Sequence, residues 1–334
     1  MVRKHESNAP ILGIDLGGTK VEIVSAHLNG EVLAQKRIPT QPKDGPDKGL
    51  ERILETAEEI LGQAQVAKND LTAIGLSVPG PLDPVAGVFF KLPNLPGWEG
   101  FRIRKKLEEH FSAPLYMDND ANATALAEWK FGAGRGYDHM IYLTMSTGIG
   151  GGLILDGKLY RGKNFNAGEV GHQVILPDGP PCGCGLLGHL EALCSGSGIA
   201  RRLRKIFGQG NSVMWELAGG DRKKLSAEIL TQAVRQGDAV AQEFFQQTLE
   251  YLATGLSNLV FILNPEAIVL GTMVAKNPDL FLKPLNRLVR ERVWDVFTPN
   301  LKILPAQLVD QVGVYAPLAV ILDAMNLEPE ELIP

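Results

Sequence analysis

Excess positive charge and long apolar runs are both missing from this sequence of 334 residues. Lys and Arg number 33 and Asp and Glu number 38, which gives a formal net charge of −5. The chain therefore lacks the basic surplus that is typical of nucleic-acid-binding proteins. No apolar run reaches the roughly 18 residues of a membrane-spanning helix, and no apolar signal segment precedes the first strand. We expect a globular protein with neither nucleic acid nor membrane as a partner.

Cysteine is scarce too, because the sequence has only 3, all between positions 182 and 194. A disulfide-stabilised fold distributes its cysteines along the chain, whereas a cluster beside histidines is typical of a metal site in a reducing compartment. We therefore expect the protein to be cytoplasmic.

One pattern of elements occurs twice along the chain. A strand, a glycine loop, a second strand and a tight turn begin at position 11, and the same order begins again at position 140. This pattern predicts a duplicated α/β fold with two domains. Residues 1–120 form the smaller domain, closed by a C-terminal segment at 316–334, and residues 121–315 form the larger one. The expected strands are 11–16, 21–28, 31–38, 72–78, 114–118, 140–145, 153–155 and 267–270, and the expected helices include 50–66, 101–111 and 316–325.

Both glycine loops suit phosphate binding, since glycine lets backbone N–H groups come close to an anion. In the first loop, Thr19 adds a hydroxyl donor and Asp15 suits Mg²⁺ held through water. An ordinary hairpin explains this first loop equally well. The second loop contains three consecutive glycines, which favours a ligand. The candidate nucleotide-binding residues are Asp15, Gly17, Gly18, Thr19 and Lys20 in the first loop, and Thr147, Gly148 and Gly150 in the second.

A cluster of thiols and imidazoles indicates a metal site. His172, Cys182, Cys184 and His189 have the spacing H-x9-C-x-C-x4-H. Two thiolates and two imidazoles suit tetrahedral Zn²⁺, and the glycines between them permit a tight turn. A site ligated only by protein is structural, so the metal would hold the loop from 172 to 189 in place. Cys194 can be a small buried residue.

Several acidic residues could take part in chemistry. Asp118-Asn119-Asp120 stands at the start of an expected helix, where capping is the simplest explanation for at least one of the three. Two acids and an amide directly after a strand also suit a general base aimed at a bound hydroxyl. The metal loop would bring Glu169 and Glu191 to the same place.

The motifs together resemble the ROK family of bacterial sugar kinases and sugar-responsive repressors, and the resemblance covers nearly the whole chain. The matching stretches are Gly13 to Lys20, the turn Pro79-Gly80, Asn94 to Trp98, Asn119 to Asn122, Gly148 to Gly152, Gly162 and Gly168 to His172. The resemblance implies an actin-like (ribonuclease H-like) fold with the active site in a cleft between two domains. It also implies ATP, Mg²⁺ and a structural Zn²⁺ as cofactors.

The resemblance also assigns roles to individual residues. Asp120 matches the catalytic base that takes a proton from the attacking sugar hydroxyl. The matching substrate-side residues are Gly80, Asn94, Asn119, Glu169, His172 and Glu191, with His172 also binding zinc. Gly271-Thr272 is similar to a later nucleotide-side glycine turn of the family.

The metal motif departs from the family pattern at one position. The family motif usually reads CxCGxxGCxE, and His189 replaces its last cysteine here. We expect a site with two His and two Cys ligands, with Cys194 as the weaker alternative for the fourth ligand.

Family members differ in what they do with a bound sugar. The repressors carry a DNA-binding helix-turn-helix segment before the first glycine loop, and the short stretch before Ile11 leaves no room for one. We therefore expect a kinase that transfers the γ-phosphoryl group of ATP to the 6-hydroxyl of glucose. A kinase for N-acetylmannosamine or N-acetylglucosamine and a non-catalytic sugar-binding regulator are the alternatives. Family precedent implies a homodimer or homotetramer.

Overall fold

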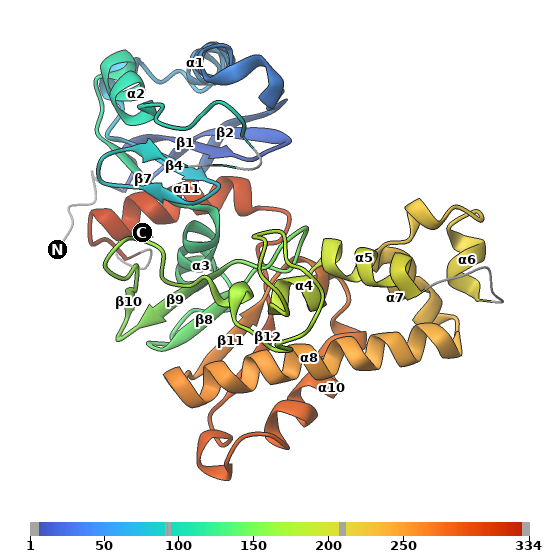
Figure 1. Cartoon of the computed structure of the whole chain (residues 1–334). Helices are drawn as coiled ribbons and strands as arrows, with labels where there is room; N and C mark the ends of the chain where they lie inside the picture. The colour runs from blue at the N-terminus through green and yellow to red at the C-terminus, as the bar shows by residue number, and fades with distance from the viewer. Residues whose placement is uncertain (1–6, 91, 93–94, 207–211, 329–334) are drawn as a thin grey trace.

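The computed structural model, which describes residues 7–90, 92, 95–206 and 212–328, has a five-stranded sheet in each half of the chain (Figure 1). The first sheet has the strand order β3-β2-β1-β4-β7, and the second has the order β10-β9-β8-β11-β12. The first sheet contains β1 (Pro10–Leu16), β2 (Lys20–His27), β3 (Val32–Pro39), β4 (Ala73–Val78) and β7 (Leu115–Asn119). The second contains β8 (Met140–Leu143), β9 (Gly151–Leu155), β10 (Lys158–Leu159), β11 (Ala267–Leu270) and β12 (Lys302–Pro305).

The two sheets share one topology. In the first, β2 is antiparallel to β1 and to β3, while β4 is parallel to β1 and to β7. In the second, β9 is antiparallel to β8 and to β10, while β11 is parallel to β8 and to β12. The repeated order and direction confirm the predicted duplicated α/β fold of the actin-like type.

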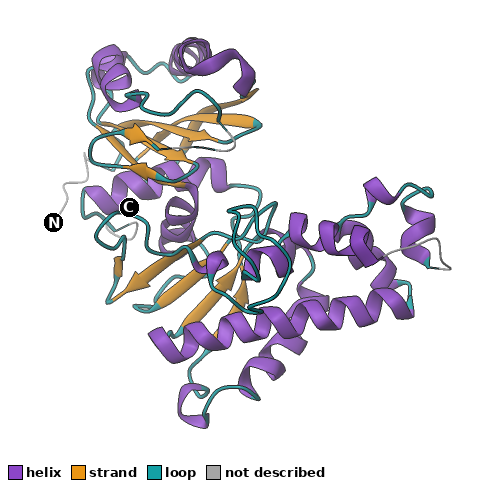
Figure 2. Cartoon of the chain, in the orientation of Figure 1, coloured by secondary structure: helices purple, strands orange, loops and turns teal. Residues whose placement is uncertain are grey.

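Helices cover both faces of the first sheet (Figure 2). On one face, α1 (Gly45–Gln63) and α2 (Ile103–Phe111) share a buried core with β1, in which Ile14 lies with Ile53 and Leu107. On the other face, Ile11 of β1 shares a second core with Ile321 of α11 (Val312–Ala324). A central strand with helices on both sides buries alternate residues in opposite cores, which explains why β1 is apolar with little alternation.

α11 lies unusually close to the first sheet. Gly75 of β4 has no side chain to separate the two, and a Cβ added there would lie 2.1 Å from the carbonyl oxygen of Pro317. α11 also packs against α3 (Asp120–Phe131), which lies on β8 and β9 of the second sheet. These two helices therefore connect the sheets, as Figure 1 shows.

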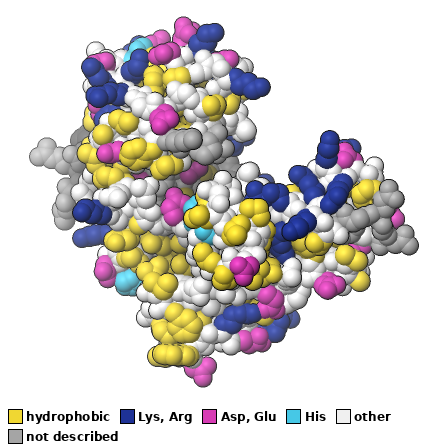
Figure 3. Space-filling model, viewed as in Figure 1, with side chains coloured by type: hydrophobic (Ala, Val, Ile, Leu, Met, Phe, Trp, Pro, Cys, Tyr) yellow, Lys and Arg dark blue, Asp and Glu magenta, His cyan; other side chains and the backbone are white. Residues whose placement is uncertain are grey.

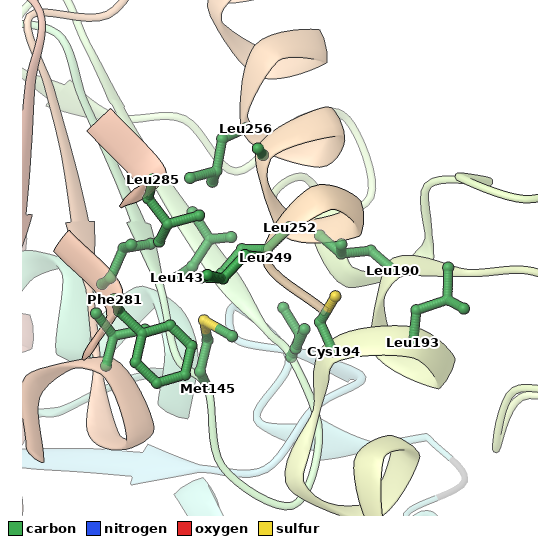
Figure 4. Close-up of a cluster of buried hydrophobic side chains, with 14 of the residues drawn as sticks. Leu143, Met145, Leu190, Leu193, Cys194, Leu249, Leu252, Leu256, Phe281 and Leu285 are labelled. Carbon is green, nitrogen blue, oxygen red and sulfur yellow. The ribbon is translucent and has the colours of Figure 1, made fainter. Parts of the chain in front are cut away.

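The largest core lies beneath the second sheet, where long helices pack on β8 and β11. Figure 4 shows side chains of α8, including Leu249 and Leu256, meeting Phe281 and Leu285 of α10 beside Leu143 of β8. The helices of this half are α4 (Leu190–Cys194), α5 (Gly196–Ile206), α6 (Val213–Leu217), α7 (Ala227–Arg235), α8 (Ala239–Leu263), α9 (Thr272–Lys276) and α10 (Pro278–Arg290). No helix in the described ranges is long and apolar enough to cross a bilayer.

The short helices α5 to α7 form a lobe that projects from the second sheet (Figure 1). Lys and Arg side chains gather over this lobe in the view of Figure 3. The exposed cations there are Arg201, Arg204, Lys205, Arg222, Lys223, Lys224 and Arg235. Positive charge is therefore concentrated on one part of a chain whose net charge is −5.

Most of the expected elements exist, although several boundaries differ. The strand predicted at 267–270 has those bounds in the structure, whereas the closing helix begins at Val312 rather than 316. Pro317 lies inside this helix, beyond its first turn. Because proline lacks an N–H and is favoured only at the start of a helix, the sequence suggested a start directly before it. The sequence interpretation also missed β12 and the helices α9 and α10.

We propose the domain division expected above, with residues 1–120 and 316–334 in one domain and 121–315 in the other. Two contacts support it. α11 packs on β1 and β4 of the first sheet, and α3 packs on the second sheet.

The close approach at Gly75 gives a first prediction. In Gly75→Ala, the added methyl group overlaps the backbone of α11, so the free energy of unfolding should fall by about 2–3 kcal/mol. The matched control is Gly62→Ala in α1, where nothing lies within 4 Å of an added Cβ. That variant should keep or raise stability by about 0.4–1 kcal/mol. Urea unfolding of both variants measures the difference, and equal stabilities would contradict the packing described for α11.

Candidate active site

Two cavities meet between the sheets. The first has a volume of about 510 Å³ and is lined by the loop after β1, the start of α3 and the start of α9. Its polar lining residues include Asp15, Lys20, Arg37, Asp120, Thr144, Ser146, Thr272 and Lys276. The second cavity has a volume of about 360 Å³ and is lined by Gly80, Asn119, Asp120, Glu169, His172, Glu191 and the second glycine loop. Asp120 therefore borders both cavities.

The turn between β7 and α3 places Asp120 at this position. Asn119 is the N-cap of α3, and its side-chain oxygen accepts a hydrogen bond of 2.7 Å from the backbone N–H of Asn122. Since Asn119 caps the helix, the carboxylate of Asp120 remains available to the cavities. The amide thus takes the capping role that the sequence left open among the three polar residues.

Asp120 has an unusually high pKa for an Asp side chain. The side chain is exposed to the two cavities, but the protein packed around it partly desolvates the carboxylate and raises the pKa to about 7. The negative charges of Asp15 and Glu169 act in the same direction. A carboxylate with this pKa suits a general base near neutral pH, because it can accept a proton and release it again.

Asp15 faces Asp120 across the first cavity. Its Oδ1 accepts a hydrogen bond of 2.7 Å from the hydroxyl of Ser77, while burial raises its pKa. Two carboxylates beside one cavity repel each other unless a cation lies near them, and oxygen ligands of this kind suit Mg²⁺. Lys20, Arg37 and Lys276 line the same cavity and supply positive charge for an anionic ligand.

The second glycine loop is held by Glu191. The backbone N–H of Ile149 donates a hydrogen bond of 3.0 Å to Oε2 of Glu191. A Cβ on Gly148 would lie 2.6 Å from this oxygen, so the loop needs glycine here to accommodate the carboxylate. Gly148, one of the glycines that suggested phosphate binding, is therefore needed for the close contact with Glu191.

Four potential metal ligands converge at the edge of the smaller cavity. One ligand atom from each of His172, Cys182, Cys184 and His189 lies within 4.8 Å of the other three. The two Nδ1 atoms of His172 and His189 are 3.3 Å apart. Sγ of Cys184 is 3.3 Å from Nδ1 of His189, and Sγ of Cys182 is 3.7 Å from Nδ1 of His172.

These distances match the edges of a zinc tetrahedron. Bonds of roughly 2.0–2.1 Å to nitrogen and 2.3 Å to sulfur give edges of about 3.4 Å between two nitrogens and about 3.6 Å between nitrogen and sulfur. The four residues therefore fit Zn²⁺ in both chemistry and spacing. Cys194 is fully buried in the apolar core shown in Figure 4, and its Sγ lies 3.5 Å from the carbonyl oxygen of Thr248. His189, not Cys194, completes the set.

The metal cluster also contacts the carboxylates of the smaller cavity. Nε2 of His172 lies 3.8 Å from Oε2 of Glu169, and Sγ of Cys182 lies 3.3 Å from Oε1 of Glu191. Nδ1 of His172 faces the cluster, so one imidazole borders both the four-residue cluster and the cavity. A metal here would orient the side chains that line the cavity.

The structure brings most of the expected residues together. The substrate-side set lines the smaller cavity, except for Asn94, which lies outside the described residues. On the nucleotide side, Asp15, Gly17, Lys20 and Thr272 line the larger cavity, and Thr147, Gly148 and Gly150 line the smaller one instead. Among the described residues, Gly18, Thr19 and Gly271 adjoin these positions without lining either cavity.

Sequence reasoning missed a third cavity, and with it the lining residues Lys276 and Glu228 among others. This cavity of about 440 Å³ shares Ser146, Thr272 and Lys276 with the larger one and extends along α7 past Glu228. Lys276 lies one helical turn after Thr272, and that spacing was the available signal. Glu228 gave no signal, because only the tertiary structure brings α7 to this place.

The chain belongs to the ROK family, whose family model matches residues 11–323. A glucokinase of Thermotoga maritima is 31% identical over 316 residues, covering 95% of this chain and 98% of that protein. A xylose repressor of Caldicellulosiruptor bescii is also 31% identical, covering 99% of this chain and 82% of the repressor.

Among solved structures, a ROK glucokinase of Streptomyces griseus in complex with glucose and AMPPNP superposes with a TM-score of 0.75. It is 29% identical, and the match covers 95% of this chain and 99% of that one. The chain is thus similar to sugar kinases and to a sugar-responsive repressor over nearly its full length.

The raised pKa of Asp120 gives a second prediction. Between the ordinary Asp pKa of about 3.9 and the raised value of about 7, the folded protein binds more protons than the unfolded chain. Stability therefore falls as the pH rises through this window. Asp120→Asn has no carboxylate to ionise, so it avoids this loss of stability. Because solvent screens the open carboxylate, we expect a gain of about 1 kcal/mol in the free energy of unfolding at pH 8. This gain corresponds to a Tm roughly 1–2 °C above that of the wild type.

The difference should become small as the pH falls to about 4, where Asp120 is protonated in the folded protein and about half protonated in the unfolded chain. Calorimetry of the two proteins without ligands, from pH 4 to pH 8, measures it. A gap in Tm that does not change with pH would contradict the raised pKa.

Proposed function

We propose that this protein is an ATP-dependent sugar kinase that transfers the γ-phosphoryl group of ATP to the 6-hydroxyl of glucose. The observation that carries the proposal is the position of Asp120, which borders a cavity for an anionic ligand on one side and a polar cavity on the other. A base between two such cavities can take a proton from a hydroxyl group in one while that oxygen attacks a phosphorus atom in the other.

In the proposed reaction, the sugar oxygen forms a bond to the γ-phosphorus as the bond from that phosphorus to the β,γ-bridging oxygen of ATP breaks. ADP leaves, and the proton of the sugar hydroxyl passes to the carboxylate of Asp120. Phosphoryl transfer needs little covalent help from a protein, so positioning and charge neutralisation dominate. Mg²⁺ near Asp15 would neutralise phosphate charge, and Lys20, Arg37 and Lys276 add to it from the wall of the cavity.

The third cavity supports a nucleoside triphosphate as the donor. It continues from the anion cavity through Ser146, Thr272 and Lys276, and it combines apolar walls with polar side chains of α7. Such a cavity suits a base and a ribose attached to the phosphates. The AMPPNP and glucose named in the Streptomyces griseus structure agree with an ATP-like donor and a hexose acceptor.

The smaller cavity supports a sugar as the acceptor. Asn119, Glu169, Glu191 and His172 present amide, carboxylate and imidazole groups, which form paired hydrogen bonds with hydroxyls. The similarity to glucokinases makes glucose the first choice, and N-acetylmannosamine or N-acetylglucosamine is the alternative. The repressor relative favours a sugar-binding regulator as a second function, but the placement of a base beside an anion cavity supports turnover.

We also propose that Zn²⁺ binds His172, Cys182, Cys184 and His189 as a structural ion. The ion would hold the loop between Glu169 and Glu191. We further propose that the protein is cytoplasmic, where thiols stay reduced. It would act in carbohydrate metabolism, specifically glycolysis, and work as a homodimer or homotetramer.

An ADP-release assay across hexoses and N-acetylhexosamines tests the function. Wild-type protein with ATP and Mg²⁺ should give its highest kcat/KM with glucose. Asp120→Asn should lower kcat by about 10²–10⁴-fold, because it removes a general base, while sugar binding is largely kept. The control is Asp156→Asn, an exposed residue in the turn between β9 and β10 that lines neither cavity. Near-normal turnover by Asp120→Asn would falsify the assignment of the base.

Elemental analysis tests the metal site. The purified protein should contain about one zinc per chain, and His189→Ala should contain far less and have a Tm several degrees lower. Cys194→Ala is the control, since Cys194 lies in the apolar core and should leave the zinc content unchanged. Loss of zinc from the Cys194 variant with retention by the His189 variant would reverse the ligand assignment.

A further inference from the structure

Arg161 forms ion pairs with two carboxylates, Asp118 and Asp323, that have no direct role in the proposed reaction. It follows β10 in the second half of the protein, and its guanidinium reaches two carboxylates. Its Nε donates to Oδ2 of Asp118 at 2.6 Å, and its Nη2 donates to Oδ2 of Asp323 at 2.8 Å. Asp118 is the last residue but one of β7 in the first sheet, and Asp323 belongs to α11. One side chain thus joins the second half of the chain to the first sheet and to the helix packed on it.

Asp118 is a buried carboxylate that depends on this contact. Only 2% of its side chain is exposed. Its Oδ1 accepts hydrogen bonds of 2.8 Å from the backbone N–H of Asn119 and from Nδ2 of Asn122. Within the described part of the chain, Arg161 is the cation paired with Asp118. A buried charge that loses its partner is strongly destabilised, so without Arg161 this carboxylate has to move, take up water or bind a proton.

The hydrogen bonds of Asp118 determine the shape of the turn that carries the base. Asn119 and Asn122, both bonded to Asp118, are also bonded to each other by the capping hydrogen bond. Asp120 lies between them. A shift of Asp118 therefore changes the cap and moves the carboxylate of Asp120.

The backbone of Arg161 also contacts a second segment that leads to the smaller cavity. Its carbonyl oxygen accepts a hydrogen bond of 3.1 Å from the backbone N–H of Ala167. This bond closes the loop that leads directly to Glu169, a lining residue of the cavity. The residue is thus in contact, through one hydrogen bond each, with the segments that carry Asp120 and Glu169.

We propose that Arg161 is a positioning residue for phosphoryl transfer, which acts through Asp118 to hold the carboxylate of Asp120 against the sugar hydroxyl. This inference rests on the proposed function. Arginine suits the role because its planar fork meets two carboxylates at once in a fixed geometry, whereas the single ammonium group of lysine does not. Arg161 also lines a separate cavity of about 640 Å³, which Asp120 does not line.

Three variants test the proposal. Arg161→Met removes the charge and keeps most of the apolar stem. Arg161→Lys keeps the charge and loses the fork. Asp323→Asn is the matched control, because it weakens the other arm of Arg161 and leaves the contact with Asp118 in place.

Steady-state kinetics, at a temperature well below every Tm, is the first readout. Arg161→Met should lower kcat by about 10- to 100-fold, because small displacements of a catalytic group are costly, while KM for ATP changes by less than about twofold. Arg161→Lys should fall between this variant and the wild type. Asp323→Asn should keep kcat within about twofold of the wild type although its Tm falls.

Hydrogen exchange of the segment from Tyr116 to Thr124 is a second readout that needs no activity. In Arg161→Met, the amides of Asn119 and Asn122 should exchange at least about tenfold faster, since their acceptors have moved. In Asp323→Asn they should stay protected. This readout separates the two ideas: a wild type without kinase activity would contradict the proposed function, and the exchange pattern would still report on Arg161.

Two results would overturn the proposal. One is a wild-type kcat in Arg161→Met together with a lowered Tm, which would make Arg161 a purely structural tie. The other is unchanged amide exchange at Asn119 and Asn122 in that variant. If Arg161→Met fails to fold, Arg161→Lys decides alone, and an undiminished kcat in it would count against the proposal.

Discussion

The hydrogen bond from the backbone of Asn122 to the side chain of Asn119 is the interaction on which the candidate active site depends. This hydrogen bond caps the N-terminus of α3 directly after β7. At this turn the chain passes from the first sheet to the helix that lies on the second sheet. Because an amide performs the capping, the neighbouring carboxylate of Asp120 stays free. A helix start that needs no charge from Asp120 leaves that charge for chemistry.

The smaller cavity gathers acidic groups that would repel one another in an isolated cluster. Glu169 and Glu191, on either side of the loop from 172 to 189, reach it together with Asp120 of α3. Burial raises the pKa of Glu169, and the negative charge of Glu191 adds to this effect. The cost of bringing these groups together is offset by packing elsewhere, above all in the large apolar core around α8 and α10. This arrangement is typical of binding sites, where stability is exchanged for function.

The sequence predicted the fold well where local signals are strong. The repeated order of strand, glycine loop, strand and tight turn, together with apolar runs, located most strands of both sheets. The prediction from sequence was weaker for elements whose hydrophobic periodicity is faint or interrupted. β12 lies at the edge of the second sheet and only one of its residues, Ile303, is buried, so its periodic signal is faint. The helices α9 and α10 follow each other across a proline, and that interruption hides their periodicity.

The chemical types of the site followed from the sequence alone. The H-x9-C-x-C-x4-H spacing indicated a metal, and two carboxylates after a strand indicated a base. These signals are local, since ligands and caps have to stand at short separations. Tertiary structure alone decided which of the acids borders both cavities, that His189 and not Cys194 joins the metal cluster, and that Arg161 pairs with Asp118 across 43 positions of sequence. Such choices depend on distances between segments far apart in the chain, and these distances arise only when the sheets and helices pack.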